Sequence, residues 1–166
     1  MLQTVDKNRH QNMKKIEVVN LVNKVKEEFP SYKFYAVGSW VRRNPNFKDY
    51  DINIVPPKEK RSPSNIEEWS NVLKMFDKKE FDGKKVDAQV LPVLEKLLKM
   101  SAKEIKERRN NIHFRYFYSE GNRIPKTNSL KVIKLKNNMW MSISRVIPNK
   151  LRAKNLDNSA IHYKEL

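Results

Sequence analysis

The sequence predicts an α+β protein folded as one compact domain, and three observations lead to this prediction. Apolar residues recur at helical spacing in some segments, other segments alternate apolar and polar residues as strands do, and Gly, Pro and Asn mark the boundaries between them. At 166 residues the chain is long enough for one domain with a hydrophobic core and too short for two. The order helix, strand, turn, strand, helix, strand, helix and then strands favours a mixed sheet with flanking helices.

The first predicted elements lie on either side of Pro30. Residues 13–29 carry apolar side chains at helical spacing, so they predict an amphipathic helix that Pro30 ends. Tyr32 to Val37 is typical of a short buried strand, which the pair Gly38-Ser39 ends. We expect Trp40 to Arg43 to begin a brief helix.

The next strand and helix follow a strict pattern. The segment from Asp49 to Val55 alternates, with its aspartates on one face and apolar residues on the other, and two prolines close it. After a charged loop, Ser64 and Glu67 have the spacing of a capping box for a helix that runs to about Phe76.

A hairpin turn at Asp82-Gly83 leads into a strand from Lys84 to Leu91, in which Asp87 shares one face with Gln89. Pro92 is suited to the first position of the next helix.

The remaining predicted elements are mainly strands. Ser101 and Glu104 form a second capping box, which begins a basic stretch. Strands are predicted at 112–118, 130–135 and 139–143, the last two joined by Asn137-Asn138. The tail from Val146 is basic and carries no pattern that predicts an element.

The composition narrows the classes of function. Thirty-five Lys and Arg against nineteen Asp and Glu give a net charge of +16, which attracts polyanions. Nucleic acid is the expected partner, with an acidic membrane surface as the alternative. No stretch approaches the roughly 18 apolar residues of a membrane span, and the first residues lack an apolar signal core. We therefore expect a soluble, intracellular protein, cytoplasmic or, if viral, inside the host cell.

Metal ligands are limited by the same composition. The chain has no cysteine, which excludes disulfides, thiolate zinc sites and cysteine nucleophiles, and its three histidines are scattered. Any bound metal is therefore expected to have oxygen ligands, as magnesium, manganese and calcium prefer.

Three aspartates are the candidate metal ligands and catalytic residues. Asp49 and Asp51 share one face of a strand, and Asp87 lies in a second strand with the same alternation. If these strands are neighbours, the three carboxylates meet and can hold two divalent ions roughly 3.5 to 4 Å apart, the arrangement that phosphoryl transfer uses. Taken singly, an Asp-x-Asp is often a solvated strand edge, and Gly38-Ser39 is often only a strand-ending turn.

The order and spacing of these parts resemble a known signature. The stretch 34–55 reads FYAVGSWVRRNPNFKDYDINIV, an apolar strand, Gly-Ser, nine residues and then Asp-x-Asp flanked by apolar residues. This is similar to the polymerase-beta-type nucleotidyltransferase superfamily, most of all to minimal family X DNA polymerases of the kind that some viruses encode. The resemblance runs from the first strand through Asp87, and it is specific as a set rather than in any one part.

The resemblance implies a role for each residue. Gly38 and Ser39 would open a short helix whose N–H groups receive the nucleotide triphosphate. Asp49 and Asp51 would hold two Mg²⁺ ions, with Mn²⁺ as a substitute, and Asp87 would also be a ligand and would activate the attacking 3′-hydroxyl.

Further nucleotide contacts follow from the same resemblance. Arg42 and Arg43 would bind phosphate, although family X enzymes usually place such residues one position earlier and a Val-Arg pair is typical of CCA-adding enzymes. Tyr116 and Phe117 resemble the aromatic pair that faces the sugar and base in family X, while their alternation is equally that of a core strand. Basic clusters suit a nucleic-acid backbone, and they lie at 103–109, 131–136 and 150–154.

The sequence thus predicts a palm-like mixed sheet with flanking helices at 13–100 and a β-rich extension at 101–166, thumb-like or nucleic-acid-binding, in a single domain 1–166. The expected function is a monomeric nucleotidyltransferase that uses a nucleoside triphosphate to extend a nucleic-acid 3′-end, DNA rather than RNA. Three alternatives stay open: an RNA-directed or template-independent terminal or tRNA nucleotidyltransferase, a noncatalytic nucleic-acid-binding module, and a transferase that modifies a protein or small molecule.

Overall fold

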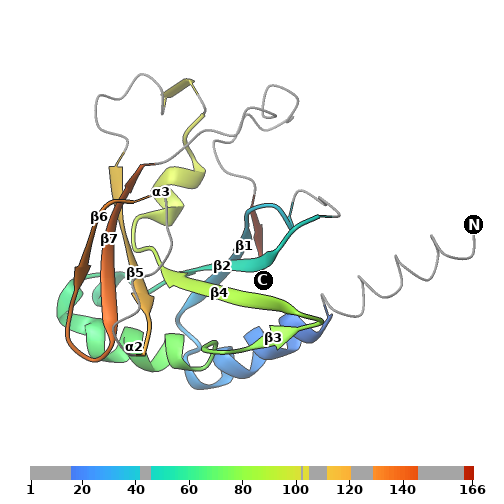
Figure 1. Cartoon of the computed structure of the whole chain (residues 1–166). Coiled ribbons are helices and arrows are strands. Elements are labelled where there is room, and N and C mark those ends of the chain that lie inside the picture. Colours follow the sequence, from blue (N-terminus) through green and yellow to red (C-terminus); the bar gives the residue numbers. More distant parts are fainter. Residues whose placement is uncertain (1–15, 42–45, 102, 105–111, 121–128, 146–162) are drawn as a thin grey trace, which may run out of the picture.

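The structure, a computed structural model, describes residues 16–41, 46–101, 103–104, 112–120, 129–145 and 163–166. Within these ranges the fold is α+β, as predicted: a mixed, mostly antiparallel sheet of eight strands with few helices (Figure 1). The strands are β1 (Lys33–Val37), β2 (Asp49–Val55), β3 (Glu80–Phe81), β4 (Lys84–Val90), β5 (Ile112–Tyr118), β6 (Ser129–Lys134), β7 (Met139–Arg145) and β8 (Tyr163–Glu165).

The strand order brings distant segments together. Along the sheet the order is β6-β7-β5-β4-β2-β1-β8, and β3 pairs with β4 beside this path. Strands β2 and β4 are parallel, whereas every other pair is antiparallel. A parallel pair needs a crossover connection, and the chain between β2 and β4 supplies it with α2 (Ile66–Lys74).

Two hairpin turns have the backbone that their sequences predict. Asp82 and Gly83 have φ values of 54° and 75°, and Asn137 and Asn138 have φ values of 60° and 58°. Positive φ at both central positions is typical of the type I′ turn, whose twist matches that of the flanking strands. These turns connect β3 to β4 and β6 to β7.

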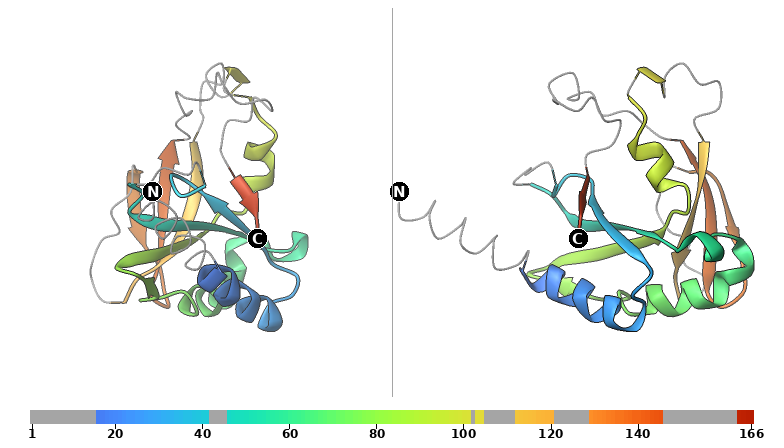
Figure 2. Two further views of the ribbon diagram at one scale, coloured as in Figure 1. Left: turned by 90° about the vertical axis from the view of Figure 1, so that its right-hand side faces the viewer. Right: turned by 180° about the vertical axis from the view of Figure 1, so that it is seen from behind.

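Helices cover both faces of the sheet. The helical residues 16–28 and α2 lie along one face, and the short α3 (Leu94–Leu98) lies on the other (Figure 2). The larger core lies between the sheet and the two helical segments 16–28 and α2, with Trp69, Tyr50 and Phe34 almost fully buried. A smaller core forms between α3 and the opposite face.

The predicted helix boundaries hold only in part. Ser101 and Glu104 form the predicted capping box, with N–H to side-chain distances of 3.4 and 3.1 Å. The box at Ser64 and Glu67 is wrong: Ser62 caps a short 3-10 turn, η2 (Pro63–Asn65), and α2 starts after it. A second 3-10 turn, η1 (Lys58–Lys60), lies in the charged loop.

Two other boundaries differ from the prediction. The residues from Ser39 to Val41 form a turn rather than the start of a helix, and 42–45 lie outside the described residues. Pro92 lies in a turn, and α3 begins two residues later. In the part of the chain that the structure describes, no helix has the length and apolar character needed to cross a membrane.

Candidate active site

Three carboxylates lie on one face of the sheet where β1, β2 and β4 meet. Val37 of β1 pairs with Asp51 of β2, and Asp51 pairs in turn with Asp87 of β4. Asp49 precedes Asp51 by two residues and therefore points to the same face. Strands β2 and β4 are thus neighbours, so the three acids lie together, as the sequence predicts for neighbouring strands.

Gly38 fits closely against one of these acids. It follows β1 with a φ of 84°, and a methyl group in its place would collide with Oδ2 of Asp51 and lie 3.3 Å from its Cγ. The positive φ and the close approach of the Asp51 carboxylate together favour glycine here. The Gly-Ser turn therefore passes directly over the Asp51 carboxylate.

Two hydrogen bonds fix the turn that starts at Gly38. Val41 N–H donates to the Gly38 carbonyl at 3.2 Å, and Trp40 Nε1 donates to the Asp51 carbonyl at 3.0 Å. Trp40 is 4% exposed and packs edge-on against Tyr50, with ring centroids 5.2 Å apart. Trp40 thus belongs to the core, where it anchors the turn to β2.

The environment of Asp51 favours its protonated form. Burial raises the pKa of Asp51 to about 7, and the charges of Asp87 and Asp49 add to this effect. The Arg115 guanidinium opposes it. Asp51 also hydrogen-bonds to Asp87, and two carboxyl groups can do so only when one of them holds a proton. A pKa of about 7 leaves Asp51 partly protonated near neutral pH.

Asp87 combines solvent access with a perturbed pKa. Its side chain is exposed toward a cleft, while the protein atoms around it displace enough solvent to raise its pKa. Asp49 raises the pKa of Asp87 further, and Arg115 and the hydrogen bond from Asp51 lower it. The third predicted acid is therefore both reachable and coupled to the other two.

The three acids offer oxygen ligands of the kind that divalent cations prefer. Within the described residues, no group of three or more acidic or histidine side chains is already arranged as a metal site. Asp51 and Asp87 instead form a coupled pair with Asp49 nearby, and burial raises the pKa of both. Because a cation can replace a carboxyl proton, the chemistry of Asp49, Asp51 and Asp87 suits Mg²⁺ or Mn²⁺.

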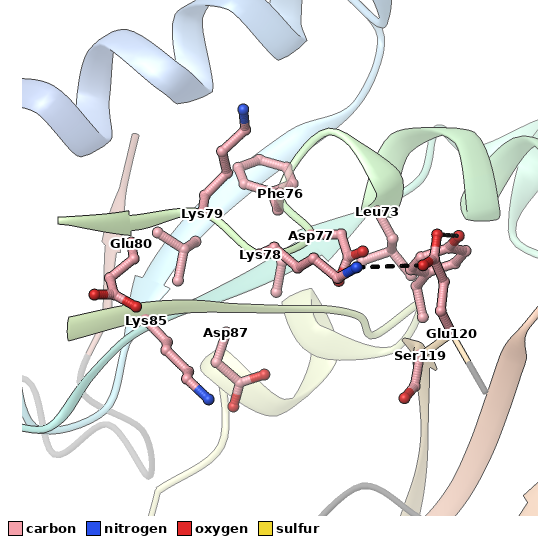
Figure 3. A pocket seen from close by; sticks show the side chains of 13 residues that line it. Leu73, Phe76, Asp77, Lys78, Lys79, Glu80, Lys85, Asp87, Ser119 and Glu120 are labelled. Atoms are coloured by element: carbon pink, nitrogen blue, oxygen red, sulfur yellow. Dashed lines mark hydrogen bonds and ion pairs between the residues drawn. The ribbon is translucent and has the colours of Figure 1, made fainter. Parts of the chain in front are cut away.

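A cleft of about 710 Å³ opens beside Asp87 (Figure 3). It lies between the turn after α2 and the end of β5, because β4 and β5 pair in register at Val90 and Tyr116 and separate toward the start of β4. The ion pair of Lys78 with Glu120, 3.4 Å long, bounds one side.

Both lysines and acids line this cleft. Lys79 and Lys85 are exposed and line it together with Lys78. Lys85 and Asp87 extend to the same side of β4 in Figure 3, whereas Phe76 lies on the other side. The lining also holds the acids Asp77, Glu80 and Glu120, so the cleft carries charges of both signs, with Lys85 on the side of Asp87.

Arg115 is a site residue that the sequence reasoning missed. It lies on β5, next to β4 in the sheet, and its charge acts on both Asp51 and Asp87. The alternation of β5 puts Arg115 on the face of His113 and opposite its aromatic neighbours. That signal was present in the sequence, but placing Arg115 beside the acids also needs the strand order.

The other predicted nucleotide contacts lie in different places. Ser39 is half-buried beside Gly38, whereas Arg42 and Arg43 lie outside the described residues. Tyr116 is 5% exposed and packs on Trp69 in the larger core, with ring centroids 4.9 Å apart. It is thus on the face opposite the acids, where a sugar or base cannot reach it.

Phe117 points to the same face as the acids but is also 6% exposed, and it pairs in register with Trp140. Of the basic clusters, Lys131, Lys134 and Lys136 are exposed on the β6 hairpin. The cluster at 150–154, and most of that at 103–109, lies outside the described residues.

Comparisons with known proteins give no relative from which to transfer a function: no family model, no curated protein and no solved structure matches the chain.

Proposed function

We propose that this protein is a metal-dependent nucleotidyltransferase that adds nucleotides to the 3′-end of a nucleic acid, as a small family X-like DNA polymerase does. One observation carries the proposal: Asp51 and Asp87 lie side by side on parallel strands, and the Gly38 turn passes over the Asp51 carboxylate. The signature and its geometry thus coincide at one point of the sheet. In this proposal, 13–100 form the palm and 101–166 the extension.

The residues of the chain would act mainly by binding and orienting the triphosphate and the 3′-hydroxyl. The Gly38-Ser39 turn would present backbone N–H groups and a hydroxyl to the triphosphate. Asp87, which faces the cleft, would accept the proton of the 3′-hydroxyl. Two Mg²⁺ ions held by the three aspartates would neutralise the phosphates and stabilise the attacking and leaving oxygens.

The partner follows from charge. A net charge of +16 favours binding to a polyanion, and Lys85 extends to the same side of β4 as Asp87. Contacts of this kind are sequence-independent, as a general polymerase or terminal transferase requires.

The test is incubation of the purified protein with labelled DNA primer-template, DNA primer alone or RNA primer, each with Mg²⁺ or Mn²⁺ and deoxy- or ribonucleotides. Template-dependent extension is the expected result. Extension of bare or RNA primer would instead assign the chain to the terminal or RNA-directed transferases.

The matched variants are Asp51→Asn and Glu59→Gln. The first removes a carboxylate from the site, and the second removes an exposed one on η1. We expect Asp51→Asn to abolish extension while keeping nucleic-acid binding, and Glu59→Gln to retain both. Near-normal extension by Asp51→Asn would refute the catalytic assignment, and binding without extension by the wild-type protein would favour a noncatalytic module.

A further inference from the structure

Arg115 carries a charge that its hydrogen-bonding partners do not neutralise. Its Nε donates to His113 Nε2 at 2.6 Å, and its Nη1 donates to Gln89 Oε1 at 3.4 Å. Both partners are well buried, at 3% and 5% exposure. A guanidinium fixed between two uncharged groups keeps its full charge available to nearby anions.

His113 must be neutral to make this contact. Its Nε2 accepts the hydrogen bond from Arg115, so Nε2 has no proton and Nδ1 carries the ring proton. Burial, together with the adjacent guanidinium, lowers the pKa of His113 to about 3. His113 therefore acts as a fixed acceptor that sets the orientation of the Arg115 side chain.

The anions that this charge reaches are the acid pair. Gln89 follows Asp87 by two residues on the same face of β4, so the group that holds Nη1 belongs to the strand of the third acid. The charge of Arg115 lowers the pKa values of both Asp51 and Asp87. The hydrogen bond to Gln89 thus holds the Arg115 guanidinium on the face of β4 that carries Asp87.

We propose that Arg115, oriented by His113 and Gln89, is a positioning residue that serves as a built-in counter-charge to Asp51 and Asp87. It stabilises the two carboxylates before a cation binds, and it competes electrostatically with that cation. This inference deepens the proposed function, and only the part of the inference that concerns catalysis rests on that function. Removing Arg115 should therefore weaken the metal-free protein and strengthen metal binding, a combination that a purely structural arginine does not produce.

The first experiment is a double-mutant cycle in EDTA at pH 8, which needs no catalysis. Arg115→Gln, Asp87→Asn and the double variant are compared with the wild type by thermal unfolding. If the two charges attract each other, the double variant should be more stable than the sum of the two single changes predicts, by roughly 3 °C or more in midpoint. A control cycle pairs Arg115→Gln with Glu120→Gln, an exposed carboxylate bonded to Tyr118, and should be additive.

The second experiment is a Mg²⁺ titration of the same variants, followed by the rise in midpoint temperature. Arg115→Gln should bind Mg²⁺ several-fold more tightly than the wild type, because a cation beside the site has been removed. Arg115→Lys keeps the charge but cannot donate to both His113 and Gln89, so its affinity for Mg²⁺ should lie between those of the wild type and Arg115→Gln. It serves as the test variant if Arg115→Gln does not fold.

The two experiments separate this inference from the proposed function. An additive cycle with Asp87→Asn, or unchanged or weaker Mg²⁺ binding by Arg115→Gln, would overturn the inference even if the wild-type protein extends primers. A coupled cycle with tighter Mg²⁺ binding would support it even if no primer is extended.

Discussion

Replacing Asp51 by Asn is expected to stabilise the metal-free protein at alkaline pH while removing the proposed activity. The folded state holds the Asp51 proton with a pKa of about 7, against an ordinary value of 3.8. A carboxyl whose folded pKa is raised is tolerated at low pH, and it costs stability as the pH rises from about 4 through 7. Above pH 7 the whole cost is present, because folding then confines a charge in a poorly solvated site beside two others.

The size of the effect follows from the same values. At about 1.4 kcal/mol per pH unit, a rise from 3.8 to about 7 corresponds to on the order of 4 kcal/mol at pH 8. A change of 1 kcal/mol shifts the midpoint of a domain of this size by roughly 2 to 4 °C. Because the amide of Asn still donates a hydrogen bond to Asp87, we expect a gain of roughly 10 °C from Asp51→Asn.

The assay is thermal unfolding followed by circular dichroism, in EDTA, at several values between pH 4 and pH 9. The midpoints of the wild type and Asp51→Asn should coincide near pH 4 and separate as the pH rises to about 7. Mg²⁺ should then raise the midpoint of the wild type at pH 8 more than that of the variant, because ligand binding stabilises the folded state. Glu59→Gln, with the same change of charge at an exposed position, should follow the wild type. The reasoning fails if Asp51→Asn gains no stability at pH 8, or if the gain is already present at pH 4.

Three further predictions concern the turn, the cleft and the last strand. Gly38→Ala should lower stability and abolish extension. The control is Gly83→Ala, because Gly83 has a similar φ of 75° but nothing within 4 Å of an added Cβ, so this variant should lose only about 1 to 2 kcal/mol through backbone strain. Equal losses in unfolding midpoint would contradict the close approach of Gly38 to Asp51. Lys79→Glu in the cleft should weaken binding to a labelled oligonucleotide and reduce its salt dependence, and Lys58→Glu on η1 should do so much less; equal effects in a binding titration would argue against the cleft. Deleting residues 163–166 should lower the unfolding midpoint, because it removes the partner of the β1 edge and the packing of the last side chain on the core; an unchanged midpoint would show that β8 adds nothing to the sheet.

Elements with a local cause could be predicted from the sequence. The bounds of β2 agree with its alternation and with the prolines that follow it, and Asp82-Gly83 forms the hairpin that its residue types favour. The capping box at Ser101 also forms, because its hydrogen bonds involve residues three apart. In each case the forces that select the structure act within a few residues.

Features that depend on distant residues could not be predicted in the same way. The strand β8 is three exposed residues that form a strand because the edge of β1 lies beside them. Helix α2 starts later than predicted because Ser62, rather than Ser64, acts as a cap, and Pro63 begins a 3-10 turn before the helix. Arg115 is near the acids only because β5 follows β4 in the sheet, although about 30 residues separate it from Asp87.

The acid cluster itself favours a role that brings a cation and a polyanion together. A net charge of +16 draws phosphates toward the protein, while three carboxylates on one sheet face repel them, and burial with neighbouring charges raises the pKa values of Asp51 and Asp87. A module that only binds nucleic acid gains nothing from anions beside its cleft, and a purely structural role is disfavoured because the pKa values of Asp51 and Asp87 stay raised despite the charge of Arg115, so that their ionised forms cost stability. A divalent cation held by these acids would reverse both effects, since it would compensate the carboxylate charges and attract the phosphates that they repel. Nucleotidyl transfer requires this combination of carboxylates, cations and phosphates at one point.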